Sequence, residues 1–345
     1  MPPARVDYAI VGGLRDDYFI TPDGEAHLHQ LGGNALFAAV GAHVWARQPA
    51  QPPAKTIGLI SRVGANFPRE WLDEIARRGI DVGGVVVRPE PLDTRTFYAY
   101  RSLEERDDTD PAAHFRRIGQ ALPAALAGYA TSTEGQEHRT QFSPLGVRPE
   151  EVAADYLEAR AFHLAPYDFS VHAAMPGLVR SRPGRLLTCD PSIRYMQPRY
   201  AQEAGEIIRE LDAFLPSEVE TRAFFGGVLD DLWQAAEAFG AIGARCVVLK
   251  IGARGQYVYD AGSRRKWHVP AYPSRVVDVT GAGDAYCGGF LAGLAETCDP
   301  LEGALHGCVS ASLVVEGTGA LYALDTRREQ MDARLAALRL AVKAI

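Results

Sequence analysis

The chain has 345 residues, of which 47 % are hydrophobic, and a formal net charge of -7 at pH 7. This length and composition suffice for one large α/β domain with a sizeable core. A mildly acidic chain is poorly suited to nucleic acid or an anionic membrane surface, so we expect neither partner. The 5 cysteines are scattered and form no C-x-x-C pair, which favours reduced thiols in a cytoplasmic protein without a zinc site.

The first third of the chain alternates apolar strands with a helix of small residues. YAIVGG (8–13) is typical of a buried strand that ends on glycines. LGGNALFAAVGAHVWA (31–46) indicates a glycine turn followed by a helix, and residues 56–64 predict a second strand. Residues 82–88 and 94–101 are rich in β-branched and aromatic residues, which predicts further strands.

The middle of the chain separates two regular regions. Residues 102–136 are the least regular, and the charged run ERDDTDP within them indicates a solvated loop, so we expect an insertion or a mobile excursion here. From residue 151 onward strand and helix patterns alternate, and the strands are continuously apolar. This pattern predicts an α/β fold with a parallel sheet covered by helices on both faces.

A glycine-rich turn, DVTGAGDAYCGG (278–289), precedes an apolar helix near the C-terminal third. The turn therefore lies at a helix N-terminus, where free N–H groups and the helix dipole favour an oxyanion such as phosphate. An acid there would repel the anion unless it has a chemical role. We interpret Asp284 as a general base that takes a proton from an attacking hydroxyl during phosphoryl transfer. Helix capping by Asp284 is an equally open interpretation.

Two common nucleotide-binding motifs are excluded. A Walker A loop requires GK[ST], which does not occur in the chain. The dinucleotide motif G-x-G-x-x-G fails because Tyr286 stands at its third glycine position after Gly281 and Gly283.

With this turn and the order of the strands, the chain resembles the ribokinase-like (pfkB) family of carbohydrate kinases. DVTGAGDAYCGGFLAGL is similar to the C-terminal signature of that family. The segments LGGNALFAAVGA, CDPSIR, LPSEVE and LKIGARGQYVY resemble, in order, its Gly-Gly segment, D-x-N-x-R, N-x-x-E and T-x-G-x-x-G. The resemblance covers nearly the whole chain apart from residues 102–136.

The resemblance implies a single ribokinase-like domain over residues 1–345. Its fold would be a doubly wound, mostly parallel sheet with helices on both faces and a small β-lid. We expect the lid segments near residues 14–31 and 84–101, with residues 137–145 as a further candidate. Lids of this family often form dimer contacts, so a homodimer through the lid is one arrangement that the resemblance suggests.

The resemblance also implies an activity, namely ATP- and Mg²⁺-dependent transfer of the γ-phosphoryl group to a primary hydroxyl of a sugar or sugar-like alcohol. Asp284 would be the general base, and Gly281, Ala282 and Gly283 would form the anion hole. Thr280 and Asp278 stand where many members bind a monovalent cation such as K⁺, although the match there is partial.

On the donor side, Glu220 matches the acid of N-x-x-E, which orders the water shell of Mg²⁺. Magnesium fits this role because it keeps several waters when bound. Ser217 replaces the Asn of the motif, and Glu220 could instead be a solvated acid in a first helical turn. Gly252 and Gly255 match the nucleotide-side glycines. Lys250 replaces the usual Thr and could contact a phosphate as a point charge, or simply emerge at a strand end.

On the acceptor side, Asp17 stands where the family uses an acid to hold sugar hydroxyls. Gly32 and Gly33 would let the backbone approach the same ligand, and Asn34 is a candidate hydroxyl partner. All of these residue types also favour turns, so a purely structural role stays open.

Departures from the family pattern leave the acceptor open. Arg15 stands where ribokinases often have Asn, and Phe37 stands where most members have the last Asn of G-G-x-x-x-N. The acceptor could therefore be aromatic or apolar-faced, or could have an anionic group that Arg15, Arg101 or Arg194 binds. A nucleoside kinase of the same fold and a non-catalytic sugar or nucleotide sensor are the alternatives.

Overall fold

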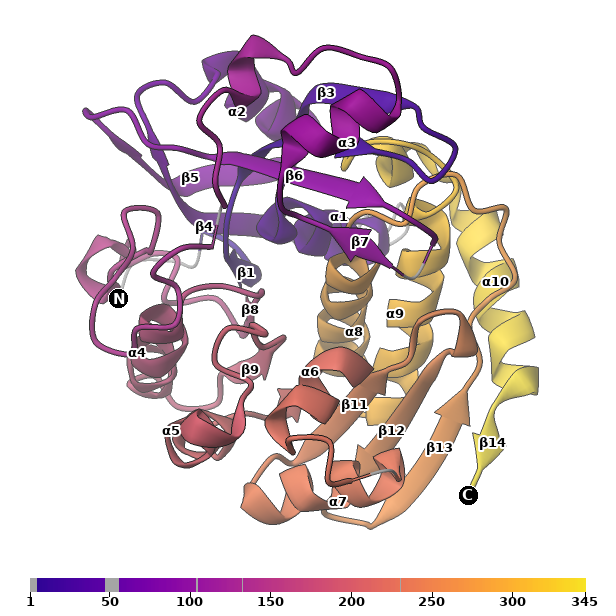
Figure 1. Cartoon of the computed structure of the whole chain (residues 1–345). Coiled ribbons are helices and arrows are strands. Elements are labelled where there is room, and N and C mark those ends of the chain that lie inside the picture. Colours follow the sequence, from indigo (N-terminus) through magenta and orange to yellow (C-terminus); the bar gives the residue numbers. More distant parts are fainter. Residues whose placement is uncertain (1–4, 47–55, 104, 132, 230) are drawn as a thin grey trace.

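The structure is a computed structural model that describes residues 5–46, 56–103, 105–131, 133–229 and 231–345. These residues form an α/β fold with one large and one small sheet (Figure 1). The large sheet contains, in spatial order, β14 (Lys343–Ala344), β13 (Arg265–Val269), β12 (Gln256–Asp260), β11 (Cys246–Lys250), β10 (Ala213–Phe214), β9 (Leu186–Cys189), β8 (Ala161–Leu164), β1 (Tyr8–Val11), β4 (Ile57–Gly64) and β5 (Ile80–Arg88).

The large sheet is mostly parallel. Every neighbouring pair from β5 to β11 is parallel, and β12, β13 and β14 continue the sheet in antiparallel pairs. In the middle of the sheet Tyr8 pairs with Ile57 on one side and with Ala161 on the other. All residues of β1, β4 and β8 are buried, as continuously apolar parallel strands require.

Helices cover both faces of the large sheet. Side chains alternate along β1, so that Tyr8 and Ile10 join one core cluster while Ala9 and Val11 join the other. The first cluster is covered by α1 (Asn34–Ala46), α2 (Arg69–Arg77), α8 (Ala282–Thr297), α9 (Pro300–Val314) and α10 (Arg328–Ala341). The second is covered by α4 (Phe169–Arg180), α5 (Ala201–Ile208), α6 (Glu218–Phe224) and α7 (Leu232–Ile242).

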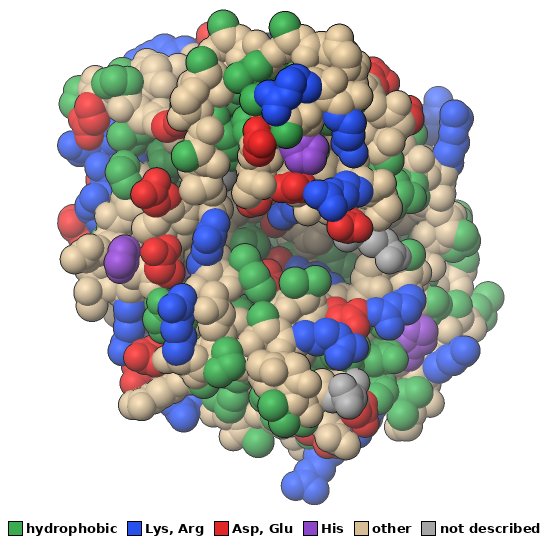
Figure 2. All heavy atoms as spheres, viewed as in Figure 1, with side chains coloured by type: hydrophobic (Ala, Val, Ile, Leu, Met, Phe, Trp, Pro, Cys, Tyr) green, Lys and Arg blue, Asp and Glu red, His purple; other side chains and the backbone are tan. Residues whose placement is uncertain are grey.

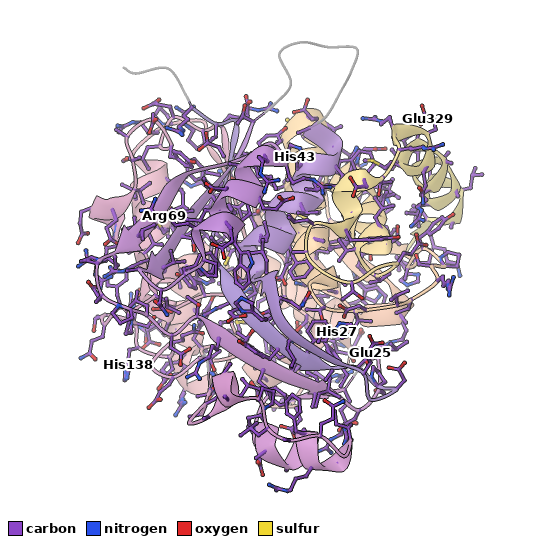
Figure 3. The ribbon with its side chains drawn as sticks, turned by 90° about the horizontal axis from the view of Figure 1, so that it is seen from above. Glu25, His27, His43, Arg69, His138 and Glu329 are labelled. Atoms are coloured by element: carbon purple, nitrogen blue, oxygen red, sulfur yellow. The ribbon has the colours of Figure 1, made fainter. Side chains whose placement is uncertain are left out.

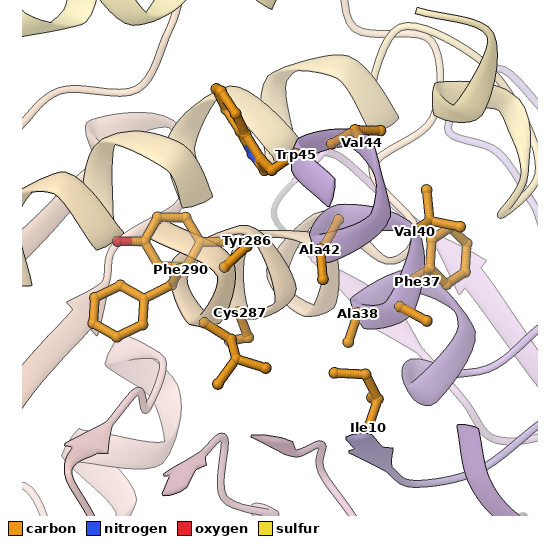
Figure 4. Packing of buried hydrophobic residues seen from close by; sticks show 14 of the residues in the cluster. Ile10, Phe37, Ala38, Val40, Ala42, Val44, Trp45, Tyr286, Cys287 and Phe290 are labelled. Carbon is orange, nitrogen blue, oxygen red and sulfur yellow. The ribbon is translucent and has the colours of Figure 1, made fainter. Parts of the chain in front are cut away.

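Small residues bring α1 and α8 unusually close together (Figure 4). A Cβ at Gly41 would lie 2.0 Å from the carbonyl oxygen of Ala285, and one at Gly288 would lie 1.8 Å from that of Ala38. Neither position can hold a larger residue, because the obstacle is backbone rather than a flexible side chain. This contact fixes the start of α8, where the glycine turn lies, against α1.

The small sheet has the order β3-β2-β6-β7 and lies above one edge of the large sheet (Figure 1). It consists of β2 (Arg15–Ile20), β3 (Ala26–Gly32), β6 (Arg95–Tyr100) and β7 (Arg106–Asp107). At the end of its β2–β3 hairpin, His27 Nε2 lies 3.6 Å from Glu25 Oε1 (Figure 3).

The outer face of the small sheet is covered by the segment that follows it. Phe97 and other apolar residues of β2 and β6 pack against Phe115 of α3 (Pro111–Arg117) and Leu126 of the 3₁₀ turn η1 (Ala124–Leu126). Figure 1 shows α3 lying over β6. The region expected to be irregular, residues 102–136, therefore contains β7, α3 and η1.

The strand bounds refine the expected lid segments. Residues 84–88 belong to β5 of the large sheet, whereas β2, β3 and β6 form the small one. Residues 137–145 contain no strand. Short 3₁₀ turns complete the described chain at η2 (Pro149–Glu151), η3 (Pro198–Tyr200), η4 (Gly252–Arg254) and η5 (Tyr322–Asp325). None of the helices in the described ranges is both long enough and apolar enough to span a membrane.

Candidate active site

The predicted site residues lie at the carboxyl edge of the parallel strands, beneath the small sheet. This edge is the usual ligand site in open α/β sheets. Figure 2 shows the molecular surface hollowed at this place, with acidic and basic side chains around the hollow. Segments far apart in the sequence meet here: β2 and β6 from above, and the ends of β9 and β11 and the start of α8 from below.

The glycine turn begins helix α8 in the way the sequence predicts. Gly281 is the N-cap with a φ of 74°, which a residue with a side chain rarely adopts. Ala282, Gly283 and Asp284 form the first turn of the helix, where N–H groups lack intrahelical partners. One of these groups is engaged, because Ala282 N donates to Val279 O at 3.2 Å.

Phe37 packs directly on this turn. A Cβ at Gly281 would lie 2.1 Å from the Phe37 ring, and only 4 % of Phe37 is exposed. The ring of Phe37 is thus buried against the turn, and a stacking role toward an aromatic acceptor stays a prediction. Its role is to fill the place that a side chain at position 281 would need.

Asp284 is partly accessible and lies among charges from several elements. Burial raises its pKa to about 6, against the lowering effect of Lys250 and Arg106, while Glu220 and Asp17 add to the increase. A carboxyl group with a pKa near neutrality is mostly ionised at pH 7 and is still basic enough to take a proton from a hydroxyl in the transition state. This environment fits the base interpretation better than capping alone, because the N-cap of α8 is Gly281 and not Asp284.

Lys250 lies at the end of β11 and faces the same turn. Its Nζ forms an ion pair with Asp190 Oδ2 and lies 3.5 Å from Cys287 Sγ. It is also 3.7 Å from the point that a Cβ at Gly283 would occupy. Burial favours the neutral amine, but Asp190 outweighs this effect, so that the pKa of Lys250 is raised and the charge persists. Lys250 therefore places a fixed positive charge beside the proposed anion hole.

Glu220 forms a capping box with the residue that replaces the family Asn. Its Oε2 accepts hydrogen bonds from Ser217 N at 2.7 Å and from Ser217 Oγ at 2.8 Å. Ser217 Oγ accepts in turn from Glu220 N at 3.3 Å. Burial and the neighbouring Asp190 raise the pKa of Glu220 to about 7. The geometry thus shows the structural role of Glu220 and leaves its metal role as a prediction.

Asp278 and Thr280 hold the turn that precedes α8. Asp278 Oδ1 accepts a hydrogen bond from Thr280 N at 2.9 Å, and both residues are buried. Thr280 Oγ1 lies 2.9 Å from the hydroxyl of Tyr100, the last residue of β6. The small sheet is therefore hydrogen-bonded to the turn. Over the described part of the chain, no group of three His, Cys, Asp or Glu side chains could hold a metal ion.

Gly252 and Gly255 shape the connection from β11 to β12. Both have positive φ, 60° and 96°. A Cβ at Gly255 would lie 2.2 Å from the carbonyl oxygen of Val269, whereas the space around Gly252 is open. Gly255 is thus required by a close approach of two backbone segments, and Gly252 lies on the open side of the turn.

On the acceptor side, Asp17 is buried on β2 and accepts a hydrogen bond from Thr96 Oγ1. A Cβ at Gly32 would lie 1.8 Å from Asp17 Oδ2, so the glycine makes room for this carboxylate. Gly33 has a φ of 103° and no space for a side chain, because Gly13 O would lie 2.4 Å away. Burial raises the pKa of Asp17 to about 6.

Asn34 joins two strand ends. Its Oδ1 accepts from Gly13 N at 2.8 Å, and its Nδ2 donates to Pro166 O. These bonds connect the residues that follow β1 and β8. Asn34 is thus engaged with the backbone, and a role toward a ligand hydroxyl stays a prediction that rests on its second N–H.

Two residues of this site were not predicted from the sequence. Asp190, in the segment CDPSIR, pairs with Lys250 and has a buried Oδ1 without a hydrogen-bond partner in the described residues. Arg106, in the run ERDDTDP that indicated a solvated loop, lies over the ring of Tyr98 at 4.6 Å and within electrostatic reach of Asp284. CDPSIR could have identified Asp190, whereas nothing in the local pattern identifies Arg106.

The residues of this site fit a nucleoside triphosphate with Mg²⁺. The N-terminus of α8 and Lys250 Nζ provide positive charge beside Gly283, which has open space around it. The unpartnered Oδ1 of Asp190 and the nearby Glu220 are oxygen acceptors of the type that bind waters of Mg²⁺.

Comparison with known proteins finds similar kinases. Residues 185–327 match the model of the pfkB family carbohydrate kinases. The chain is 28 % identical over 295 residues to a cytidine kinase of Thermococcus kodakarensis, covering 84 % of this chain and 88 % of that protein. It is also 28 % identical over 317 residues to a 2-dehydro-3-deoxygluconokinase of Thermoproteus tenax, covering 87 % and 84 %.

The fold is shared with a solved structure. A putative ribokinase II from E. coli, determined in complex with ATP and Mg²⁺, superposes with a TM-score of 0.69 at 20 % identity over 96 % of this chain and 99 % of that one. The large sheet, its helices and the small sheet thus form a ribokinase-like α/β fold. Residues 185–327 thus match the pfkB family carbohydrate kinases, and the chain as a whole is similar in sequence to curated kinases and in fold to a ribokinase-like structure.

Proposed function

We propose that the chain transfers the γ-phosphoryl group of ATP to a primary hydroxyl of a sugar, a sugar-like alcohol or a nucleoside, with Asp284 as the general base. The observation that supports this proposal most strongly is the position of Asp284. It lies in the first turn of α8, with a pKa raised to about 6 by burial and with Lys250 and Arg106 in electrostatic reach.

Phosphoryl transfer requires a base, an anion hole and a group that orients the substrate. Asp284 takes the proton of the acceptor hydroxyl as its oxygen bonds to the γ-phosphorus, and the bond from that phosphorus to the bridging oxygen breaks, so that ADP leaves. The N–H groups of Gly281 and Gly283, and that of Ala282 once it leaves Val279 O, would face the charge that develops on the phosphoryl oxygens. Asp17 orients the substrate by accepting hydrogen bonds from the hydroxyls of the substrate, since an ionised carboxylate can only accept hydrogen bonds.

The donor side supplies charge and positioning. ATP brings the phosphoryl group, and Mg²⁺ offsets the charge of its phosphates. Lys250, held by Asp190, adds a fixed positive charge beside Gly283. Gly252 lies on the open side of the turn after β11, where the nucleotide would approach, and Gly255 allows the close backbone contact that shapes this turn. Glu220 and Asp190 would bind the waters of the metal.

Two features remain proposals of the same kind. Thr280 and Asp278 would hold a monovalent cation such as K⁺ beside the anion hole, which an activity series in K⁺, Na⁺ and choline salts tests. The small sheet would close over the acceptor as a lid and exclude water, favouring transfer over hydrolysis of ATP. We place the enzyme in the cytoplasm, where its free cysteines stay reduced.

A nucleoside is the second candidate acceptor. It is favoured by the similarity to a cytidine kinase over 84 % of this chain. The similarity to a 2-dehydro-3-deoxygluconokinase over 87 % of the chain supports a sugar derivative to the same degree.

The test is ATP consumption with a panel of sugars, sugar acids and nucleosides, for the wild type and for Asp284→Asn. We expect turnover with at least one acceptor in the wild type and none in the variant. Tight binding of an acceptor without turnover in the wild type would favour a non-catalytic sensor and would overturn the proposal.

A further inference from the structure

Arg15 is a buried cation with an unsatisfied donor in the proposed acceptor site. The residue is 6 % exposed, and its Nη1 is buried without a hydrogen-bond partner among the described residues. A buried charged donor that lacks a partner costs several kcal/mol. Such a group is retained when something else provides the missing acceptor, and a ligand is the obvious source in a binding site.

Arg15 lies on the same strand face as Asp17. Both belong to β2, and residues two apart on a strand point to the same side, separated by about 7 Å. The opposite face of the small sheet is the one that packs on α3 through Tyr18 and Ile20. One small molecule can therefore contact Arg15 and Asp17 together.

The backbone around Arg15 leaves room for its guanidinium group. Gly13 has no side chain, and a Cβ there would lie 3.0 Å from Arg15 Nε. Gly33 lies against the backbone of Arg15. A Cβ at Gly33 would lie 2.8 Å from Arg15 N, so no side chain fits there either. Glycines thus surround Arg15 on the side where a ligand would approach Asp17.

The charge of Arg15 is already offset by the protein. Arg15 lowers the pKa of Asp17 and of Asp168, although burial keeps both values raised. Asp168 is fully buried at the start of α4. Asp93 is also within electrostatic reach of Arg15, so an anionic acceptor would add a fourth negative charge here. A neutral group with a lone pair satisfies the free N–H of Arg15 without that repulsion.

We infer that Arg15 is a specificity-determining residue that donates to a neutral lone-pair acceptor, a carbonyl oxygen or ring nitrogen, on the substrate beside the hydroxyls bound by Asp17. This selects a nucleoside with a carbonyl-bearing base as the substrate class, rather than a sugar acid. The inference rests on the proposed kinase function and narrows its acceptor.

Binding is measured by calorimetry with a nonhydrolysable ATP analogue and Mg²⁺ present, using cytidine, uridine, D-ribose and 2-dehydro-3-deoxygluconate as probes. The wild type should bind at least one of the nucleosides. Arg15→Met should weaken that binding by about 10- to 100-fold, as expected for a lost hydrogen bond to a charged group. Its affinity for D-ribose, which lacks a base, should stay within about twofold of the wild type.

Two further variants separate specificity from structure. Arg15→Gln keeps a donor and a similar shape, and should retain more nucleoside affinity than Arg15→Met. Arg116→Met is the control, since Arg116 is an exposed arginine on α3, which covers the outer face of the small sheet away from Asp17. It should leave the affinities of all four probes unchanged. Thermal unfolding of each variant establishes that it is folded. If Arg15→Met does not fold, the nucleoside affinity of Arg15→Gln decides whether Arg15 contacts the base.

Several outcomes would overturn the inference. They are equal nucleoside affinity in the wild type and both Arg15 variants, preferred binding of the sugar acid that depends on Arg15, or no nucleoside binding by the wild type. ATP consumption is assayed separately with the same probes. Absence of turnover with every acceptor defeats the kinase proposal, while the binding series still decides the role of Arg15.

Discussion

At the scale of single residues, the site depends on how a few charges set the basicity of Asp284. Burial raises its pKa to about 6, and Lys250 and Arg106 hold it from rising further. Each of these three residues comes from a different part of the chain, so each can be changed separately. Two predictions follow from this arrangement.

Asp284→Asn should abolish turnover, because the amide cannot accept the proton, while ATP affinity changes little. In the wild type, kcat/KM should fall as the pH drops below about 6, because protonation of Asp284 removes the base. Steady-state kinetics from pH 5 to 8 and nucleotide binding by calorimetry provide the measurements. Residual activity of Asp284→Asn above about 1 % of wild type would contradict the base assignment.

Arg106→Met should move the acidic limb of the pH–rate profile to higher pH. The positive charge of Arg106 favours the ionised form of Asp284, so its removal raises the pKa of Asp284 further. Arg106→Lys should keep the limb near its wild-type position, and Arg101→Met, on the exposed part of the same sheet, should not move it. A lower rate at every pH without a shift would show that Arg106 acts only through packing on Tyr98.

At the scale of elements, the start of α8 is fixed by its contacts with α1 and with the small sheet. Phe37 occupies the space beside Gly281, and Tyr100 binds Thr280. The sequence predicts the turn and the helix, because glycine spacing and the apolar run are local features. It does not predict that Phe37 is buried against the turn, because that contact joins residues far apart in the chain.

Gly281→Ala should lower both the unfolding temperature and kcat. The alanine must adopt a positive φ, which costs about 1–2 kcal/mol, and its Cβ must displace the Phe37 ring. Gly128→Ala is the matched control, because Gly128 has a φ of 69° and nothing within 4 Å of its ideal Cβ. Equal loss of stability in the two variants, with full activity in Gly281→Ala, would show that Phe37 yields without consequence.

Phe115→Ala should loosen the small sheet selectively. Phe115 is 1 % exposed and packs on Phe97 from outside, and removal of such a ring costs about 3–5 kcal/mol. Hydrogen exchange in β6 should accelerate and the acceptor KM should rise, because Asp17 lies on this sheet. Phe239→Ala, which removes an equally buried ring from the core beside α7, should lower global stability without this selective effect.

The packing of α3 and η1 on the small sheet also affects how two copies of the chain could associate. Since α3 and η1 occupy the outer apolar face of the small sheet, we expect a homodimer not to use that face. Light scattering should show stronger association for Phe115→Ala, which uncovers this face, than for the wild type. A stable wild-type dimer whose contact protects α3 from hydrogen exchange would contradict this expectation.

For the molecule as a whole, the buried carboxylates of the site lower the free energy of unfolding at neutral pH. Asp17, Asp190, Glu220 and Asp284 all have pKa values raised by burial, to about 6 or 7. A carboxyl whose pKa is raised by folding binds its proton more tightly in the folded state. The stability it contributes is therefore complete below its unfolded pKa and is lost as the pH rises through the folded value.

Asp284→Asn should therefore be more stable than the wild type at pH 8, by about 1 kcal/mol, since Asp284 is partly accessible and the full shift is not realised. The difference should shrink below pH 6 and vanish near pH 4, where the wild-type carboxyl is protonated. Unfolding by urea at pH 4.5, 6 and 8 measures it. A variant that is less stable than the wild type at pH 8 would contradict the unfavourable burial of this charge.

The alternation of strands and helices, the glycine turn and the place of Asp284 in the first turn of α8 could be predicted from the amino-acid sequence, because they depend on local periodicity and backbone preference. The resemblance to the pfkB family added Asp17, Glu220 and Lys250 as candidates, since each stands at a position of the family pattern. Which charged side chains lie close together became visible only in the folded chain. Arg106 comes from a charged run with no regular pattern, Asp190 pairs with Lys250 across the sheet, and Arg15 is left buried with a free donor. Electrostatic reach depends on distance in space, and the fold alone sets that distance.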